Sequence, residues 1–163
     1  MKHLIFSVTI FISTLSFSQA KNNIEIIAPD KEKTIITTAD LAKLPKHTLD
    51  SIQITNHLKE YKSTIKNIKG VLLKDVLSKI SFKEKSPKVL SEYYIVCKAE
   101  DGYKVIFSWN EIFNTSVGDN VLVIPQVEGR LKDGFSTLSP TDFVTGRRYV
   151  KMLKTIELKK VEL

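Results

Sequence analysis

Residues 93–108 read YYIVCKAEDGYKVIFS, and this stretch decides what kind of fold the chain adopts. Its two halves, 93–99 and 103–108, are rich in β-branched and aromatic residues, which favour extended strands. Between them lies Asp101-Gly102, a dipeptide well suited to a tight hairpin turn because glycine accepts a positive φ at little cost. The stretch therefore predicts an antiparallel β-hairpin and a fold rich in β structure.

Beyond the hairpin, the sequence predicts a short helix and further strands. Ser108 and Glu111 have the spacing of a capping box, in which each side chain bonds the other residue's free amide at a helix start. That helix would carry Trp109, which we expect in the core rather than against a ligand ring. Residues 121–124 predict a strand, and the lysine-rich segment 151–163 predicts an edge strand, since lysines there discourage aggregation.

The sequence before residue 93 also contains patterns that predict short strands and helices. β-branched or alternating runs predict strands at 24–27, 34–37, 51–55 and 61–68. Thr37 followed by Asp40 predicts a capped short helix, and apolar residues at helical spacing over 72–80 predict a second one. We therefore expect the α+β class: a mostly β protein of mixed sheets with a few short helices.

Residues 1–20 have the three-part pattern of a secretory signal peptide. A short basic start precedes the apolar stretch 4–17, and Ser18-Gln19-Ala20 offers a small-residue cleavage site. The apolar stretch is diluted by Ser and Thr and is shorter than the about 20 residues that a membrane-spanning helix needs. We expect cleavage after Ala20, export to a periplasm or the cell exterior without a remaining membrane span, and one domain over residues 21–163.

Composition and motifs disfavour several kinds of site. The net charge of +7 comes from dispersed lysines, which suits a basic surface or a small anionic ligand better than nucleic acid. Cys97, the only cysteine, lies in an apolar run and is predicted to be a buried thiol without a disulfide partner. His47 and His57, which remain after signal removal, lack zinc-ligand spacing. The sequence contains no phosphate loop, dinucleotide fingerprint or nucleophile elbow.

Short motifs follow one another in a recognisable order from residue 70 onward. They are Gly70-Val71-Leu72-Leu73, Asp101-Gly102-Tyr103, Trp109 to Phe113, Gly129-Arg130-Leu131 and Gly146-Arg147-Arg148-Tyr149-Val150-Lys151-Met152-Leu153. This order resembles the oxidoreductase molybdopterin-binding domain of the sulfite oxidase family over about residues 41–158. The resemblance implies a sulfite oxidase-type molybdopterin-binding fold.

The resemblance also implies a ligand site. Arg148 and Lys151 fall on basic positions that face the pterin and its phosphate in that family, and Tyr103 falls near an active-site tyrosine. An arginine fork and a lysine charge both suit a phosphate group. The alternatives are that Arg148 and Lys151 are solvated strand residues and that Tyr103 packs across the hairpin.

The chain departs from the family where catalytic members carry a metal-binding cysteine. The corresponding residues 54–58 read ITNHL and contain no thiol. Because threonine and asparagine do not replace a soft sulfur ligand, we expect no metal held by a protein cysteine. His57 would then be a substitute ligand, a ring contact or an ordinary surface residue.

These observations favour an exported, non-catalytic domain of the sulfite oxidase type that binds a pterin, molybdopterin or other small anionic ligand. Arg148 and Lys151 would pair with the anionic end, while Asn56, His57 and Tyr103 would contact the ring. Such a domain could pass its signal to a protein partner. Two alternatives stay open: a molybdopterin-dependent oxidoreductase with an atypical metal ligand, and a protein-interaction module whose own side chains fill the pocket.

Overall fold

A computed structural model describes residues 23–80, 83–125 and 134–162 of the chain. The expected signal peptide and the motif at 129–131 lie outside these residues. The described elements, in chain order, are β1 (Asn23–Ile27), β2 (Lys33–Thr37), α1 (Thr38–Leu41), β3 (His47–Thr55), β4 (Tyr61–Leu72), α2 (Leu73–Leu77), α3 (Pro87–Leu90), β5 (Tyr93–Ala99), β6 (Lys104–Ser108), α4 (Trp109–Phe113), β7 (Leu122–Ile124), β8 (Phe135–Leu138), the 3-10 turn η1 (Thr145–Arg148) and β9 (Val150–Lys160). Among them, no helix is long and apolar enough to cross a membrane.

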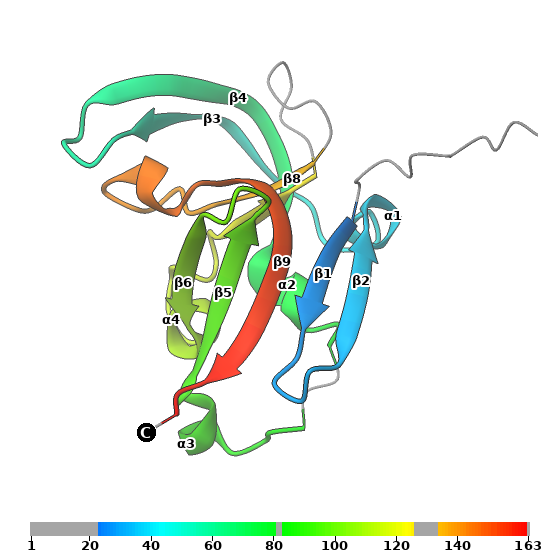
Figure 1. The fold of residues 1–163 in the computed structure, drawn as a ribbon. Helices are drawn as coiled ribbons and strands as arrows, with labels where there is room; N and C mark the ends of the chain where they lie inside the picture. Colours follow the sequence, from blue (N-terminus) through cyan, green and yellow to red (C-terminus); the bar gives the residue numbers. More distant parts are fainter. Residues whose placement is uncertain (1–22, 81–82, 126–133, 163) are drawn as a thin grey trace, which may run out of the picture.

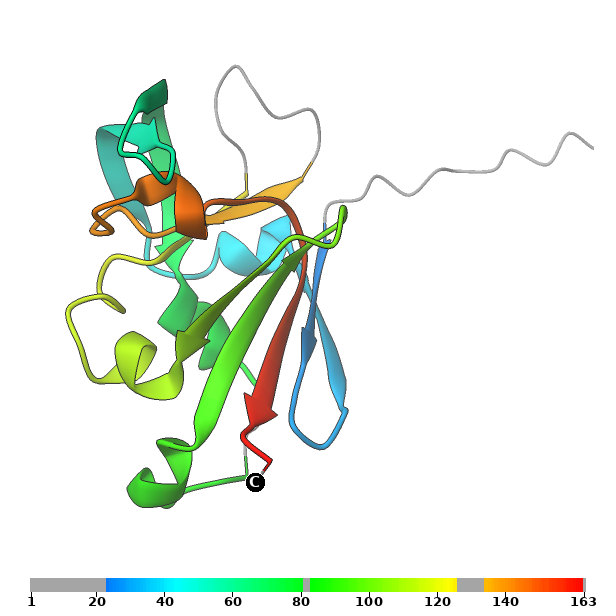
Figure 2. The same ribbon diagram turned by 60° about the vertical axis from the view of Figure 1, so that its left-hand side comes forward.

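The strands form one mixed sheet in the order β2-β1-β9-β8-β7-β4-β3, with β5 and β6 joined to it through β9. β1 and β9 run parallel, and the other pairs are antiparallel. Helices α2 and α4 lie on one side of the β6-β5-β9-β1-β2 part, as Figures 1 and 2 show. The expected α+β class, mostly β with short helices, is confirmed.

Strand β9 lies inside the sheet, so the predicted edge strand at 151–163 was wrong. It pairs with β1, β5 and β8, and it is the red strand between β5 and β1 in Figure 1. Leu153, Ile156 and Leu158 on this strand are buried, whereas the lysines at 151, 154 and 160 are exposed. The lysines therefore mark the solvent-facing positions of an interior strand.

The hairpin over residues 93–108 forms as predicted. β5 and β6 pair in register from Tyr94 opposite Ser108 to Lys98 opposite Lys104, and Gly102 adopts a φ of +90° in the turn. Cys97 is fully buried on this hairpin, which confirms the expectation of a structural thiol. Burial raises the pKa of its thiol to about 12, so the thiolate is disfavoured.

Capping boxes predicted two of the helices well, and apolar spacing predicted a third less well. The capping boxes at Thr37–Asp40 and Ser108–Glu111 both form, at the starts of α1 and α4. The predicted helix over 72–80 is shorter, because Leu72 still pairs with Leu122 in the sheet and α2 ends at Leu77. Trp109 stacks on Phe113 with ring centroids 4.0 Å apart and packs against the core, as expected.

Two apolar clusters support the fold. The larger lies between the β5-β9-β1 part of the sheet and the short helices, and includes Phe107, Phe135 and Ile156. The smaller lies where β4, β7 and β8 meet, and includes Ile54, Ile68 and Leu138. The smaller cluster runs along the long β3–β4 arm, from Leu72 at its base to Ile54 near its turn, and the arm curves over η1 in Figure 1. The arm and η1 thereby come to face each other.

Replacement by alanine should destabilise the protein to different extents at two glycines, because packing restricts one position and a positive φ restricts the other. A Cβ at Gly118 would overlap the Ile112 backbone carbonyl, whereas a Cβ at Gly102 would meet nothing within 4 Å. We expect Gly118→Ala to cost about 3 kcal/mol in free energy of unfolding and Gly102→Ala only about 1 kcal/mol. Urea unfolding followed by circular dichroism measures both. Equal losses would contradict the close packing at Gly118.

Candidate functional site

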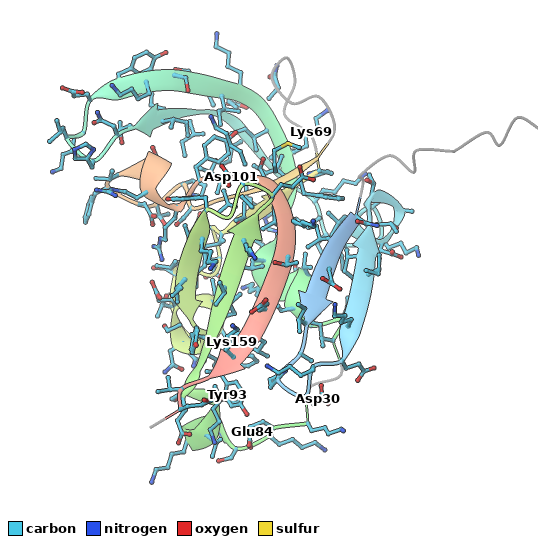
Figure 3. The ribbon with its side chains drawn as sticks, viewed as in Figure 1. Asp30, Lys69, Glu84, Tyr93, Asp101 and Lys159 are labelled. Atoms are coloured by element: carbon cyan, nitrogen blue, oxygen red, sulfur yellow. The ribbon has the colours of Figure 1, made fainter. Side chains whose placement is uncertain are left out.

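A pocket of about 430 Å³ lies between the end of the β3–β4 arm, η1 and the β5–β6 turn. Its lining residues are Ile54, Thr55, Asn56, His57, Lys62, Ser63, Tyr103, Gly146, Arg147, Tyr149 and Lys151. The β5–β6 turn, marked by Asp101 in Figure 3, lies at the end of the sheet nearest the arm, opposite Tyr93 and Lys159. Segments that are far apart in the sequence therefore build one pocket.

The pocket brings together four of the residues predicted for the site. Asn56, His57, Tyr103 and Lys151 all belong to its lining. Arg148 does not, and the neighbouring Arg147 lines the pocket instead. The sequence motif thus lies beside the pocket, but Arg147 rather than the predicted Arg148 lines it.

Arg148 is engaged inside the protein by two carboxylates. Its Nε and Nη2 donate to the two oxygens of Asp142 at 2.7 and 2.6 Å, and its Nη1 donates to Glu111 Oε1 at 2.9 Å. Its guanidinium carbon also lies 4.5 Å from the centre of the Phe107 ring, and its side chain is 23% exposed. All three guanidinium nitrogens of Arg148 thus form hydrogen bonds, and these bonds join η1 to α4 and to the loop at 142.

This network shifts the pKa of each partner. Hydrogen bonding to Asp142 is the main cause that raises the pKa of Arg148, against an opposing effect of burial. Burial alone would raise the pKa of Asp142 and of Glu111. Hydrogen bonds to both carboxyls and the positive charge of Arg148 outweigh burial, so both pKa values lie below their usual range. The network is therefore ionised near neutral pH.

Thr145 clamps η1 against the end of β3. Its hydroxyl donates to the Gln53 carbonyl oxygen at 2.7 Å and accepts from the Thr55 amide at 3.0 Å. The next residue, Gly146, lies so close that a Cβ there would overlap the Thr55 carbonyl oxygen. Tyr103 adds a second link, because its hydroxyl donates to the Arg147 carbonyl oxygen at 2.6 Å. The pocket walls are thereby tied together by hydrogen bonds.

Lys151 is directed by a bulge in β9. Phe135 pairs with Leu153 and Thr137 with Val150, so two residues of β9, Lys151 and Met152, lie opposite the single residue between them on β8. Met152 adopts a φ of +52°, which is uncommon for a residue with a side chain. Bulges of this kind bend a strand and redirect its side chains. Lys151 consequently lines the pocket, with its Nζ 5.3 Å from the centre of the Tyr149 ring.

Asn56 shapes the end of the arm. Its side-chain oxygen accepts from the amides of Leu58 and Glu60, and its side-chain nitrogen donates to Glu60 Oε2 at 2.8 Å. The side-chain amide group of Asn56 therefore makes its hydrogen bonds within the turn. His57 beside it is exposed, and the hydroxyl oxygen of Thr55 is buried without a hydrogen-bond partner in the described residues.

The charges of the pocket suit an anion. Lys62, Arg147 and Lys151 line it, and among the described residues its lining includes no aspartate or glutamate. Lys62 makes an exposed ion pair with Glu60 at 3.4 Å, which is weak at that distance and exposure. Arg147 has an exposed side chain that is free to form a bidentate contact.

The donors do not fit a thiolate-held molybdenum. The stretch 54–58 contributes an imidazole and hydroxyl and amide groups, and Cys97 is buried in β5 outside the pocket lining. Across the three described ranges, no group of three or more His, Cys, Asp or Glu side chains is placed to hold a metal ion. The pocket lining therefore offers no soft sulfur ligand for a metal.

Sequence reasoning missed Lys62, Arg147 and Thr145. Arg147 stands next to a predicted residue, but η1 is a 3-10 turn, so the two-residue alternation of a strand does not indicate which arginine faces inward. Lys62 resembles the many other exposed lysines in the sequence. Thr145 gave a weak signal through its place before Gly146, in the motif that carried the resemblance.

Substitutions of the two adjacent arginines should change the free energy of unfolding by different amounts. Arg148→Met leaves Asp142 and Glu111 without their cation, so we expect a loss of about 2 to 3 kcal/mol in free energy of unfolding. Arg147→Met removes an exposed side chain and should change it by about 0.5 kcal/mol or less. Urea unfolding of both variants measures the difference. A larger loss for Arg147→Met would contradict the network.

The same network predicts sensitivity to acid. Because the pKa values of Asp142 and Glu111 are lowered in the folded state, their contribution to stability is present above the ordinary carboxyl pKa of about 4 and is lost as the pH falls through the lowered values. We expect the melting temperature to fall more steeply below about pH 4 in the wild type than in Arg148→Met. Calorimetry across that range measures both slopes, and parallel curves would refute the coupling.

Comparisons with known proteins support a distant relation in fold. No family model matches the chain, and no curated protein matches it. Among solved structures, it is similar to the sulfane dehydrogenase SoxCD from Paracoccus pantotrophus, with a TM-score of 0.58 and 13% sequence identity. The match covers 86% of this chain but only 39% of the dehydrogenase chain. The chain therefore shares its fold with part of that enzyme.

Proposed function

We propose that this chain is an exported, non-catalytic domain that binds a pterin-like or other small anionic ligand in the pocket between the β3–β4 arm and η1. The observation that carries the proposal is the convergence of Lys62, Arg147 and Lys151 on a pocket whose described lining includes no acidic residue. A pocket that combines a few charged groups with aromatic side chains is typical of ligand sites.

The resemblance to the molybdopterin-binding domain supports a ligand that joins a ring to an anionic end. In this pocket, Arg147 and Lys151 pair with the anionic end of the ligand, since both side chains line the pocket. His57, Tyr103 and Asn56 border the ring. Arg148 acts through its carboxylate partners by holding η1 in place.

The proposal is tested by ligand binding to the mature protein. Mass spectrometry of the protein purified from its native host identifies bound metals and small molecules. In parallel, thermal unfolding with pterin-6-carboxylate, and with inorganic phosphate, measures stabilisation. A ligand at 100 times its dissociation constant should raise the free energy of unfolding by about 2.7 kcal/mol.

Matched variants identify the site. We expect Arg147→Ala and Lys151→Ala each to weaken ligand binding about tenfold, the loss of one charged contact. Lys154→Ala, an exposed lysine on the same strand outside this pocket, should leave binding unchanged. Equal affinities for all three variants, or no binding by the wild type, would refute the site. Molybdenum bound near one atom per chain would overturn the non-catalytic assignment.

A further inference from the structure

Large apolar side chains stand exposed on the segments that surround the pocket. Leu58 is 64% exposed, Tyr61 61% and Phe143 94%, and Tyr103 on the pocket wall is also exposed. Leu58 follows the pocket residue His57, and Phe143 lies on the loop that leads into η1. We call these four side chains the hairpin–loop surface. The tip of the β3–β4 arm and the orange loop before η1 lie on the same side of the molecule in Figures 1 and 2.

Hydrogen bonds hold the segments that present these side chains. Asn56 fixes the turn that carries Leu58, through the amides of Leu58 and Glu60. Asp142, the residue before Phe143, is held by Arg148 and by the Ser139 hydroxyl at 2.7 Å. An apolar contact presented on a fixed loop loses little conformational entropy when a partner binds. Because the Phe143 side chain is 94% exposed, a partner that covers it would bury apolar area, which is favourable in water.

The charges around the hairpin–loop surface are mainly positive. The cations are Lys59, Lys62, Arg147 and Lys151. The nearby acids are Glu60, Asp101 and Asp142. Each accepts hydrogen bonds inside the protein: Glu60 from Asn56, Asp101 from the Tyr103 amide, and Asp142 from Ser139 and Arg148. A partner that matches this surface therefore combines acidic groups with apolar side chains. The apolar groups flank a hollow, which fits a protruding polypeptide segment better than a flat lipid bilayer.

We infer that the hairpin–loop surface docks an acidic, apolar segment of a partner protein across the mouth of the pocket. Phe143 and Leu58 supply the apolar anchors, and the surrounding lysines and Arg147 set the charge preference. Because Phe143 and Leu58 lie outside the pocket lining, docking does not depend on a small ligand being bound there.

Selection from a random peptide library displayed on phage, with the full mature protein as bait, tests this docking. We expect enrichment of peptides that combine Asp or Glu with aliphatic or aromatic residues. Affinity for a selected peptide should fall at least tenfold in Phe143→Ser and in Leu58→Ser. Ile35→Ser is the matched control, since Ile35 is also exposed but lies on β2, and it should leave affinity unchanged.

Several outcomes would overturn the inference. These are no enrichment, enrichment of basic peptides, or peptide affinities that Phe143→Ser does not change. Binding to phosphatidylserine vesicles that is lost in Phe143→Ser would assign the surface to a membrane instead. The same variants test the small-ligand proposal separately. Phe143→Ser and Leu58→Ser should keep the full thermal stabilisation by pterin-6-carboxylate, which Arg147→Ala should reduce.

Discussion

The hydroxyl group of Thr145 holds together two parts of the chain on which the candidate site depends. It donates to the Gln53 carbonyl and accepts from the Thr55 amide, so a single side chain satisfies two backbone groups at the end of β3. Only a glycine at 146 allows the two backbones to come this close. Without this contact, the β3–β4 arm would depend on its apolar cluster with β7 and β8, and two-stranded ribbons are marginally stable alone. With it, the arm becomes one wall of a pocket whose opposite wall is η1.

The neighbouring arginines have different surroundings in the structure. Arg148 is surrounded by acceptors from α4 and from the loop before η1, which fixes the backbone of η1. Arg147 comes next to it in a tight 3-10 turn and therefore points elsewhere, into the pocket. A cation already neutralised by two carboxylates attracts an anion weakly, whereas one without acidic neighbours attracts it strongly. The internal network therefore provides rigidity, and Arg147 and Lys151 provide the positive potential.

Local rules predicted much of the fold, and long-range pairing accounts for what they missed. The hairpin at 93–108 and the two capping boxes depend on residues a few positions apart, and all of them form. The interior position of β9 depends on its pairing with β1, which lies more than a hundred residues earlier in the chain. Strand β8 was missed because its sequence, FSTL, is short and polar at its centre, although all four residues are buried. At the site, motif order picked out Tyr103 and Lys151, which both line the pocket, while the choice between Arg147 and Arg148 required the geometry of η1. The clamp by Thr145 is a tertiary contact that no local pattern encodes.

The pocket lining contains basic residues but no thiol, and these two features have different consequences for binding. A metal site needs specific donor atoms at fixed distances, so losing one soft ligand removes the site. Anion binding needs only positive potential and free donors, and it tolerates changes in the surrounding residues. Lys62, Arg147 and Lys151 repel one another across the pocket, and that repulsion is relieved when a negative group lies between them. The arrangement therefore favours an anionic occupant, whether a small molecule within the pocket or the acidic side chains of a partner at its mouth.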